Sequence, residues 1–207
     1  MTRVYAGSAA ALVCALLGGT VYWVLTAPRS DDIYAKCRTS AVAGGAEVIG
    51  GPFSLVDETG ATVSDAEVIT KPTLIYFGYT FCPDVCPVDN ARNAGAVDIL
   101  EEQGFEVTPV FITVDPARDT PEVMAEYTDA IHPRMIGLSG SEDQIKAAAQ
   151  AYRAFYAAQP AVDGYYLVDH SIFTYLVLPE KGFVEFFRRD ISADALAGQV
   201  ACFLETA

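Results

Sequence analysis

Two cysteines spaced four residues apart are the residues of this chain best suited to chemistry. Cys82 and Cys86 lie in the segment Phe81-Cys-Pro-Asp-Val-Cys-Pro87, directly after a buried apolar stretch. Residues i and i+4 share one face of a helix, so the two sulfurs can share a metal ion or form a disulfide. Pro87 suits a first helical turn, where free backbone N–H groups stabilise a thiolate. The alternative is a pair of buried structural cysteines or a permanent disulfide.

Histidine is scarce in this chain, which holds two of them. His132 stands before Pro133 at the end of a predicted helix, where we expect a surface or helix-capping role. His170 follows a predicted strand, and a loop beside a strand end can hold an imidazole toward a neighbouring turn. Together with Cys82 and Cys86 it gives two thiolates and one imidazole. This soft donor set suits copper, or zinc with a fourth ligand.

Three aspartates are predicted to lie near these candidate ligands. Asp115 and Asp119 follow the second buried strand, at the sheet edge where α/β proteins usually bind ligands. Asp169 directly precedes His170. We interpret the three as hydrogen-bonding partners around the metal ligands, or as a rim that docks a partner. The alternative for the first two is structural, because Arg118 can pair with either carboxylate.

Strands that alternate with helices are predicted to position these residues. Such alternation indicates an α/β fold with parallel strands, finished by a hairpin, and with helices on both faces of the sheet. The expected strands, beginning with a short hairpin, are 53–56, 61–63, 74–79, 107–114, 135–138, 165–168, 173–178 and 183–187. The expected helices run to about 103, from 121 to about 130, from 141 to before Pro160, and from 192 to about 205.

The N-terminal segment is predicted to cross a membrane. Residues 4–28 include no Asp, Glu, Lys or Arg, a run of 25 residues. At about 1.5 Å per residue, a helix of this length exceeds the roughly 30 Å hydrocarbon core of a bilayer. The alternatives are a cleaved signal peptide and a lipidated Cys14. We therefore expect a membrane anchor over 1–28, a tether over 29–45 and a domain over 46–207.

The composition narrows the class of protein further. The chain has 207 residues, which allows one ordinary domain with an appendage. Hydrophobic residues make up 52% and charged residues 19%, which excludes a disordered chain. The formal net charge of -14 would repel a phosphate backbone, so nucleic acid is not an expected partner.

Four segments closely resemble one known family, the Sco/SenC proteins. They are Gly50-Gly-Pro-Phe-Ser-Leu55, Ile75-Tyr-Phe-Gly-Tyr-Thr-Phe-Cys-Pro-Asp-Val-Cys-Pro87, Val114-Asp-Pro-Ala-Arg-Asp-Thr-Pro121 and Tyr166-Leu-Val-Asp-His-Ser171. The resemblance covers about 49–205 and implies a thioredoxin-like fold with an N-terminal hairpin and a hairpin insertion. It also implies one copper ion, Cu(I) or Cu(II), bound by Cys82, Cys86 and His170. The segment 88–92 departs from the family pattern, in which a less acidic start of the helix is expected.

The resemblance implies a role in cytochrome c oxidase assembly, with several possible activities. The leading one is a membrane-anchored metallochaperone that passes copper to the copper-bearing oxidase subunit, with other copper chaperones as further partners. The second is a thiol–disulfide reductant that uses Cys82 and Cys86 without copper. A redox or copper sensor and a peroxidase are weaker alternatives. The expected location is the inner (cytoplasmic) membrane, crossed by a single span, with the domain on the periplasmic or equivalent intermembrane-space side.

Cys37 and Cys202 are the cysteines of the predicted domain and tether that the family motif does not use. Spare thiols tend to pair in an oxidising compartment. We therefore expect a disulfide that joins the tether to the closing helix and closes a loop of 165 residues. The alternative is that Cys202 is a small buried apolar residue of its helix and that Cys37 is an exposed thiol.

Overall fold

The computed structural model describes residues 15–22, 32–40, 45 and 48–207, which divide into two units. The first is Met1–Ile33, in which residues 15–22 form a helix. None of the described helices combines the length and the apolar character that a membrane span requires. The remainder of the predicted anchor lies outside the described residues. The second unit, Tyr34–Ala207, is called the domain below.

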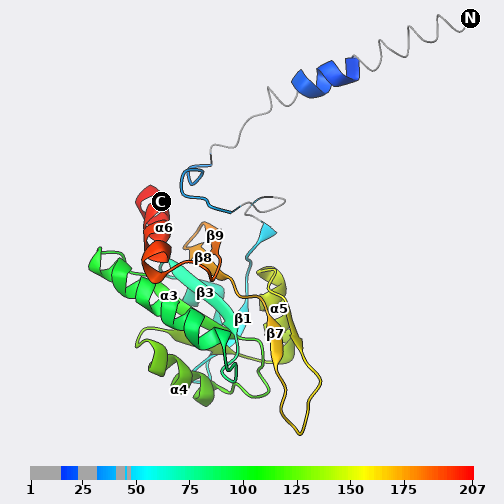
Figure 1. The fold of residues 1–207 in the computed structure, drawn as a ribbon, viewed down its shortest axis with the longest axis vertical. Helices are drawn as coiled ribbons and strands as arrows, with labels where there is room; N and C mark the ends of the chain where they lie inside the picture. Colours follow the sequence, from blue (N-terminus) through cyan, green and yellow to red (C-terminus); the bar gives the residue numbers. More distant parts are fainter. Residues whose placement is uncertain (1–14, 23–31, 41–44, 46–47) are drawn as a thin grey trace, which may run out of the picture. The chain divides into compact units, whose positions relative to one another are not determined.

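A seven-stranded sheet forms the centre of the domain (Figure 1). Strands β3, β4 and β5 run parallel to one another. Strand β1 pairs antiparallel with β5, β8 pairs antiparallel with β3, and β9 pairs antiparallel with β8. The N-terminal hairpin is β1 with β2, as predicted. In spatial order the strands are β2 (Thr62–Ser64), β1 (Ser54–Asp57), β5 (Ile136–Ser139), β4 (Thr108–Thr113), β3 (Thr73–Gly78), β8 (Thr174–Leu178) and β9 (Gly182–Phe187).

Helices cover both faces of this sheet, because alternate residues of the buried central strands point to opposite sides. On one face of the sheet, α3 packs against α4 and α6. On the other face, Tyr152, which directly follows α5, packs against Phe77 and Tyr175. The prediction of an α/β fold with helices on both faces is therefore confirmed. The helices are α2 (Asp65–Val68), α3 (Val85–Glu102), α4 (Pro121–Ile131), α5 (Glu142–Ala151) and α6 (Ala193–Thr206).

The region before His170 differs from the prediction. Helix α5 ends at Ala151, because Tyr152 is drawn into the core and Arg153 adopts the left-handed backbone conformation, with φ 54°. The chain then forms a separate two-stranded sheet of β6 (Tyr156–Ala158) and β7 (Val168–His170). The strand predicted at 165–168 therefore begins at 168 instead, and His170 is its last residue. We call the segment 155–171 the histidine arm.

His132 lies at the end of α4, as the predicted capping role requires, but it is buried. Its Nδ1 accepts a hydrogen bond from the backbone N–H of Arg134, and its Nε2 lies 3.1 Å from an Asp98 carboxylate oxygen. The expectation of a surface position was wrong, because these two partners make burial of the ring possible.

The predicted disulfide between Cys37 and Cys202 is present, with their Cα atoms 5.6 Å apart. Beside it, the ring of Tyr34 packs on Phe203 with 5.4 Å between ring centroids. The backbone N–H of Thr39 and the hydroxyl of Ser40 donate to the buried carboxylate of Glu185. Residues 34–40 of the predicted tether therefore belong to the domain, because the disulfide and these contacts fix them to it.

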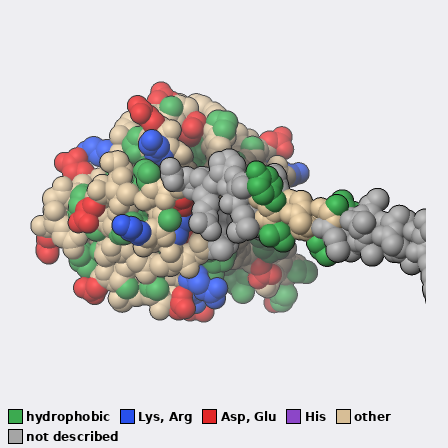
Figure 2. Space-filling view, turned by 90° about the horizontal axis from the view of Figure 1, so that it is seen from above, with side chains coloured by type: hydrophobic (Ala, Val, Ile, Leu, Met, Phe, Trp, Pro, Cys, Tyr) green, Lys and Arg blue, Asp and Glu red, His purple; other side chains and the backbone are tan. Residues whose placement is uncertain are grey.

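Charged side chains of both signs are spread over the face of the domain seen in Figure 2, with hydrophobic side chains between them. Several carboxylates are paired at the surface, as in the Arg134–Glu101 and Lys71–Glu106 ion pairs. Such exposed pairs contribute at most about 1 kcal/mol each, so the buried sheet and its helices dominate stability.

Candidate metal centre

The loop between β3 and α3 and the first turn of α3 hold the two cysteines. The backbone N–H of Cys82 donates to the carbonyl of Tyr79, which closes a turn directly after the strand. Helix α3 starts at Val85, so Cys86 occupies its first turn and its backbone N–H points to the Cys82 sulfur, 3.5 Å away. Both cysteines are buried and neither is in a disulfide. The chain therefore forms the predicted pair of thiols at a helix N-terminus.

Gly78, the last residue of β3, makes room for the second cysteine. A Cβ atom at this position would lie 2.7 Å from the Cys86 sulfur and 2.8 Å from the ring of Phe111. Both distances are far shorter than van der Waals contacts, so any other residue would displace the sulfur or the ring. The close packing of strand against helix thus fixes where Cys86 stands.

His170 reaches the cysteines from the end of β7. Its Nδ1 lies 2.9 Å from the carbonyl oxygen of Ser171; because a carbonyl only accepts, Nδ1 carries the proton and donates it. This leaves Nε2 with a free lone pair, and Nε2 lies 3.3 Å from the Cys86 sulfur. The rings of Tyr76 and Tyr79 stand edge-on to the imidazole, with centroids 6.1 and 5.7 Å from its own.

The donor atoms of Cys82, Cys86 and His170 all lie within 4.8 Å of one another. The structure therefore brings together the three residues that sequence reasoning selected as metal ligands. Cys82 and His170 line a hollow of about 280 Å³, which other residues of the histidine arm also line, and Cys86 is buried beneath them. Two sulfurs and one imidazole nitrogen at this spacing can hold one soft metal ion, with Nδ1–H anchored to a carbonyl as is usual for ligating histidines.

The two thiols have opposite acidities. A hydrogen bond from the Cys86 thiol, helped by backbone N–H groups of Asp84 and Cys86, lowers the pKa of Cys82 to about 4. Donating to the Cys82 sulfur and complete burial together raise the pKa of Cys86. At neutral pH the pair therefore holds one thiolate and one thiol. A thiolate is both a metal ligand and a nucleophile, so the pair is prepared for either chemistry.

Asp119 fixes the loop that leads to the cysteines. Its carboxylate accepts hydrogen bonds from the backbone N–H and hydroxyl of Thr80, at 3.0 and 2.6 Å, and from the hydroxyl of Thr113. Burial raises its pKa, an effect that these hydrogen bonds partly oppose. The carboxylate thus ties the end of β4 to the residue two positions before Cys82.

The other two predicted aspartates have different partners. Asp115 forms an ion pair with Arg118, which settles which carboxylate that arginine takes, and it accepts a 2.8 Å hydrogen bond from the Tyr166 hydroxyl. Asp169 lies on the exposed side of β7 and accepts a hydrogen bond from Gln159. Asp115 thus contacts the chain that leads to His170, while Asp169 stays at the rim of the hollow.

Several tyrosines contribute to the site, although sequence reasoning did not select them. Tyr79 is buried, and its hydroxyl accepts a hydrogen bond from the backbone N–H of Val168, at the start of β7. The hydroxyl of Tyr76 donates to buried Asp89. The available signal was a pair of tyrosines in the predicted strand 74–79, whose other residues are apolar or glycine, because a buried hydroxyl needs a partner.

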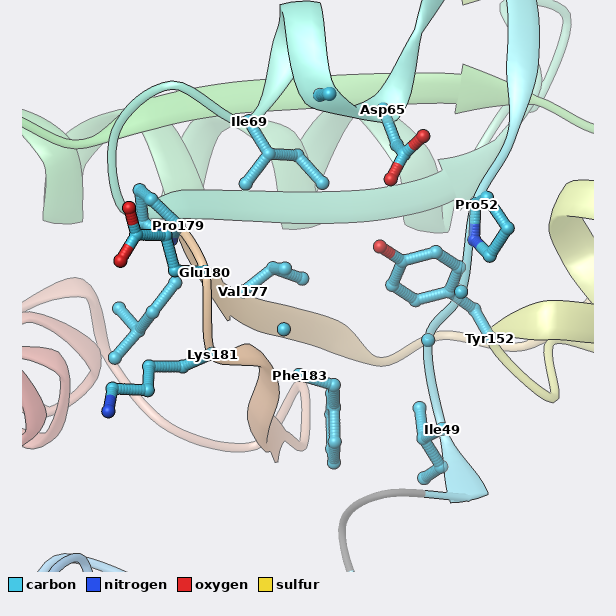
Figure 3. A pocket seen from close by; sticks show the side chains of 15 residues that line it. Ile49, Pro52, Asp65, Ile69, Tyr152, Val177, Pro179, Glu180, Lys181 and Phe183 are labelled. Atoms are coloured by element: carbon cyan, nitrogen blue, oxygen red, sulfur yellow. The ribbon is translucent and has the colours of Figure 1, made fainter.

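A second hollow lies near the opposite end of β3 (Figure 3). It measures about 480 Å³, and its walls include Ile69, Val177 and Phe183, with Tyr152 pointing into it. Its lining offers no sulfur and no imidazole. Among the described residues, the group of three potential metal ligands is Cys82, Cys86 and His170.

Comparison with known proteins identifies the family. The sequence model of the SCO1/SenC family matches residues 41–205 of this chain. Protein SenC of Rhodobacter capsulatus is 51% identical over 204 residues, which cover 99% of this chain and 90% of that protein. Two similar structures are Arabidopsis thaliana ScoI with copper bound and yeast Sco1 with copper bound. The Arabidopsis structure has a TM-score of 0.74 and 43% sequence identity, and the match covers 77% of this chain and 99% of the Arabidopsis chain. The yeast structure has a TM-score of 0.73 and 36% sequence identity, and the match covers 77% of this chain and 90% of the yeast chain. The chain belongs to the SCO1/SenC family and shares the thioredoxin-like α/β fold of its members.

Proposed function

We propose that this protein is a copper metallochaperone that binds one copper ion through Cys82, Cys86 and His170. The observation that carries the proposal is the convergence of these three donor atoms within 4.8 Å. Thiolates favour Cu(I) and the imidazole helps to retain Cu(II), so one site can serve both oxidation states. Proteins of this family are involved in copper delivery for cytochrome c oxidase, and two related structures carry copper.

The proposed recipient is the copper-bearing subunit of cytochrome c oxidase, with other copper chaperones as further partners. His170 lies half-buried at the end of a two-stranded arm, and the hollow beside it opens to solvent. A recipient can therefore approach the copper ion from the side of the histidine arm. We further propose that the N-terminal segment anchors the protein to the inner membrane, with the domain on the periplasmic or equivalent intermembrane-space side.

A second candidate function is reduction of a disulfide on the oxidase subunit, and the acidity of Cys82 favours it. Its pKa of about 4 makes it a thiolate at neutral pH. The Cys82 thiolate would attack one target sulfur and release the other as a thiolate, which leaves a mixed disulfide. Cys86 would then attack the Cys82 sulfur of this mixed disulfide and release the first target sulfur. Cys82 and Cys86 lose two electrons and form a disulfide, and the target disulfide becomes two thiols, which take one proton from Cys86 and one from water. This activity needs no imidazole.

The two functions are separated by the variant His170→Ala. Copper affinity is measured by competition with a chelator of known affinity, and dithiol reactivity by exchange with a small disulfide. If the metallochaperone proposal is right, His170→Ala loses tight copper binding and transfers less copper to the metal-free oxidase subunit. Unchanged copper binding with intact dithiol reactivity would favour the reductant instead.

A further inference from the structure

We propose that Arg118 is a positioning residue that holds His170 against the cysteine pair. The inference rests on the copper-binding function proposed above and concerns how the third ligand is placed. Arg118 lies in the loop between β4 and α4, and its side chain is 18% exposed.

His170 is the ligand whose position depends on distant contacts. Cys82 lies in the turn before α3 and Cys86 in the first turn of that helix, so the local backbone sets their separation. His170 comes from a sheet of two three-residue strands. In the described chain, neither of these strands pairs with the seven-stranded sheet. Side chains must therefore hold the histidine arm at the distance that a shared metal ion requires.

Arg118 binds the arm four residues before the histidine. Its Nη1 donates a 3.0 Å hydrogen bond to the carbonyl of Tyr166, and its guanidinium carbon lies 3.7 Å from the centroid of the Tyr166 ring. Nε pairs with Asp115, which also accepts the hydrogen bond of the Tyr166 hydroxyl. Backbone, ring and hydroxyl of Tyr166 are thus all held by this arginine or by its ion-pair partner.

The same guanidinium contacts the segment that carries the cysteines. It lies 4.9 Å from the ring centroid of Phe81, the residue before Cys82, and 5.5 Å from that of Tyr79. Tyr79 in turn accepts a hydrogen bond from the arm at Val168 and stands edge-on to His170. One side chain therefore touches both segments whose spacing defines the site.

The contacts require arginine rather than any cation. The planar guanidinium can stack on rings while its nitrogens bond in the plane to a carboxylate and a carbonyl, and an ammonium group cannot do both. Arg118→Lys should therefore keep the charge but lose the positioning. Arg118→Gln should lose the charge, the stacking and the two in-plane bonds to Asp115 and to the Tyr166 carbonyl.

The test uses the full chain in mild detergent and measures Cu(I) affinity by chelator competition. We expect Arg118→Gln to weaken copper binding by about 10- to 100-fold, the range found when residues that orient metal ligands are removed. Arg118→Lys should fall between it and the wild type. The matched control is Arg134→Gln, because Arg134 pairs with Glu101 near the far end of α3; this variant should bind as the wild type does.

A double-mutant comparison distinguishes positioning from a general loss of stability. In a His170→Ala background the two cysteine sulfurs should still bind Cu(I), although more weakly than the complete site. In this background, Arg118→Gln should change the Cu(I) affinity by less than about two-fold. An equal loss in both backgrounds would overturn the proposal. Should Arg118→Gln fail to fold, Arg118→Lys carries the same comparison.

A copper-free measurement keeps the two proposals apart. Nuclear Overhauser contacts between the His170 and Tyr79 rings should be present in the wild type and lost in Arg118→Gln. Failure of the wild type to bind copper would refute the proposed function, and these contacts would still decide the role of Arg118. Their persistence in a folded Arg118→Gln variant would refute the positioning role.

Discussion

Removing the disulfide between Cys37 and Cys202 should strongly destabilise the domain. The bond closes a loop of 165 residues, and chain entropy assigns a crosslink of this span about 5 kcal/mol of stability. In a domain of this size a loss of 1 kcal/mol lowers the melting temperature by roughly 2–4 °C, so a fall of roughly 10–20 °C is expected. The contacts of Tyr34 with Phe203 and of Ser40 with Glu185 remain in the variant. They can hold residues 34–40 in place but cannot restrict the unfolded chain.

The assay compares the copper-free wild-type fragment 31–207 with a variant that carries Cys37→Ala and Cys202→Ala together. Both substitutions are needed because a single one would leave a thiol free to pair with Cys82 or Cys86. Urea unfolding gives the free energy, and copper titration of the same variant controls for damage to the metal site. A loss below about 1 kcal/mol with an unchanged slope would refute the chain-entropy reasoning. A free Cys37 in native peptide mapping would refute the bond itself.

Two further predictions follow from the domain boundary and the thiol acidities. The fragment 31–207 should be soluble, folded and monomeric in detergent-free buffer, as circular dichroism and light scattering can test; an unfolded or membrane-bound fragment would contradict the proposed anchor. In the reduced, copper-free domain, thiolate absorbance at 240 nm should show one group titrating at about pH 4. Because folding lowers the pKa of Cys82 from the ordinary 9.0, its contribution to stability is complete above pH 9 and is lost progressively as the pH falls to 4. Cys82→Ser should remove that part of the pH dependence, and absence of thiolate absorbance at pH 6 would exclude the lowered pKa.

The main sheet and the cysteine loop were predictable because their signals are local. The runs that form β3 and β4 are apolar and rich in aromatic or β-branched residues, as buried strands are. The prolines that directly follow Cys82 and Cys86, together with the strand before them, predicted a thiol pair at a helix start. Two thiols and a scarce imidazole then limited the possible ligands to three residues.

The histidine arm was less predictable because its strands are short and depend on tertiary contacts. Tyr156–Ala158 has no apolar alternation that distinguishes a strand from the end of the preceding helix. The beginning of β7 is fixed by the hydrogen bond from Val168 to the Tyr79 hydroxyl, which joins residues 89 positions apart. Likewise, sequence left Arg118 free to pair with either aspartate, and only the position of Tyr166 beside Asp115 resolves the choice.

Copper titration of the domain in its reduced and oxidised forms tests the central claim most directly. A disulfide between Cys82 and Cys86 would consume both thiolates and leave a single imidazole, which is too few donors for a tight site. The reduced domain should bind one copper ion tightly, and the oxidised domain should bind none after passage over a desalting column. Stoichiometric copper in the oxidised domain would contradict a site built from Cys82, Cys86 and His170.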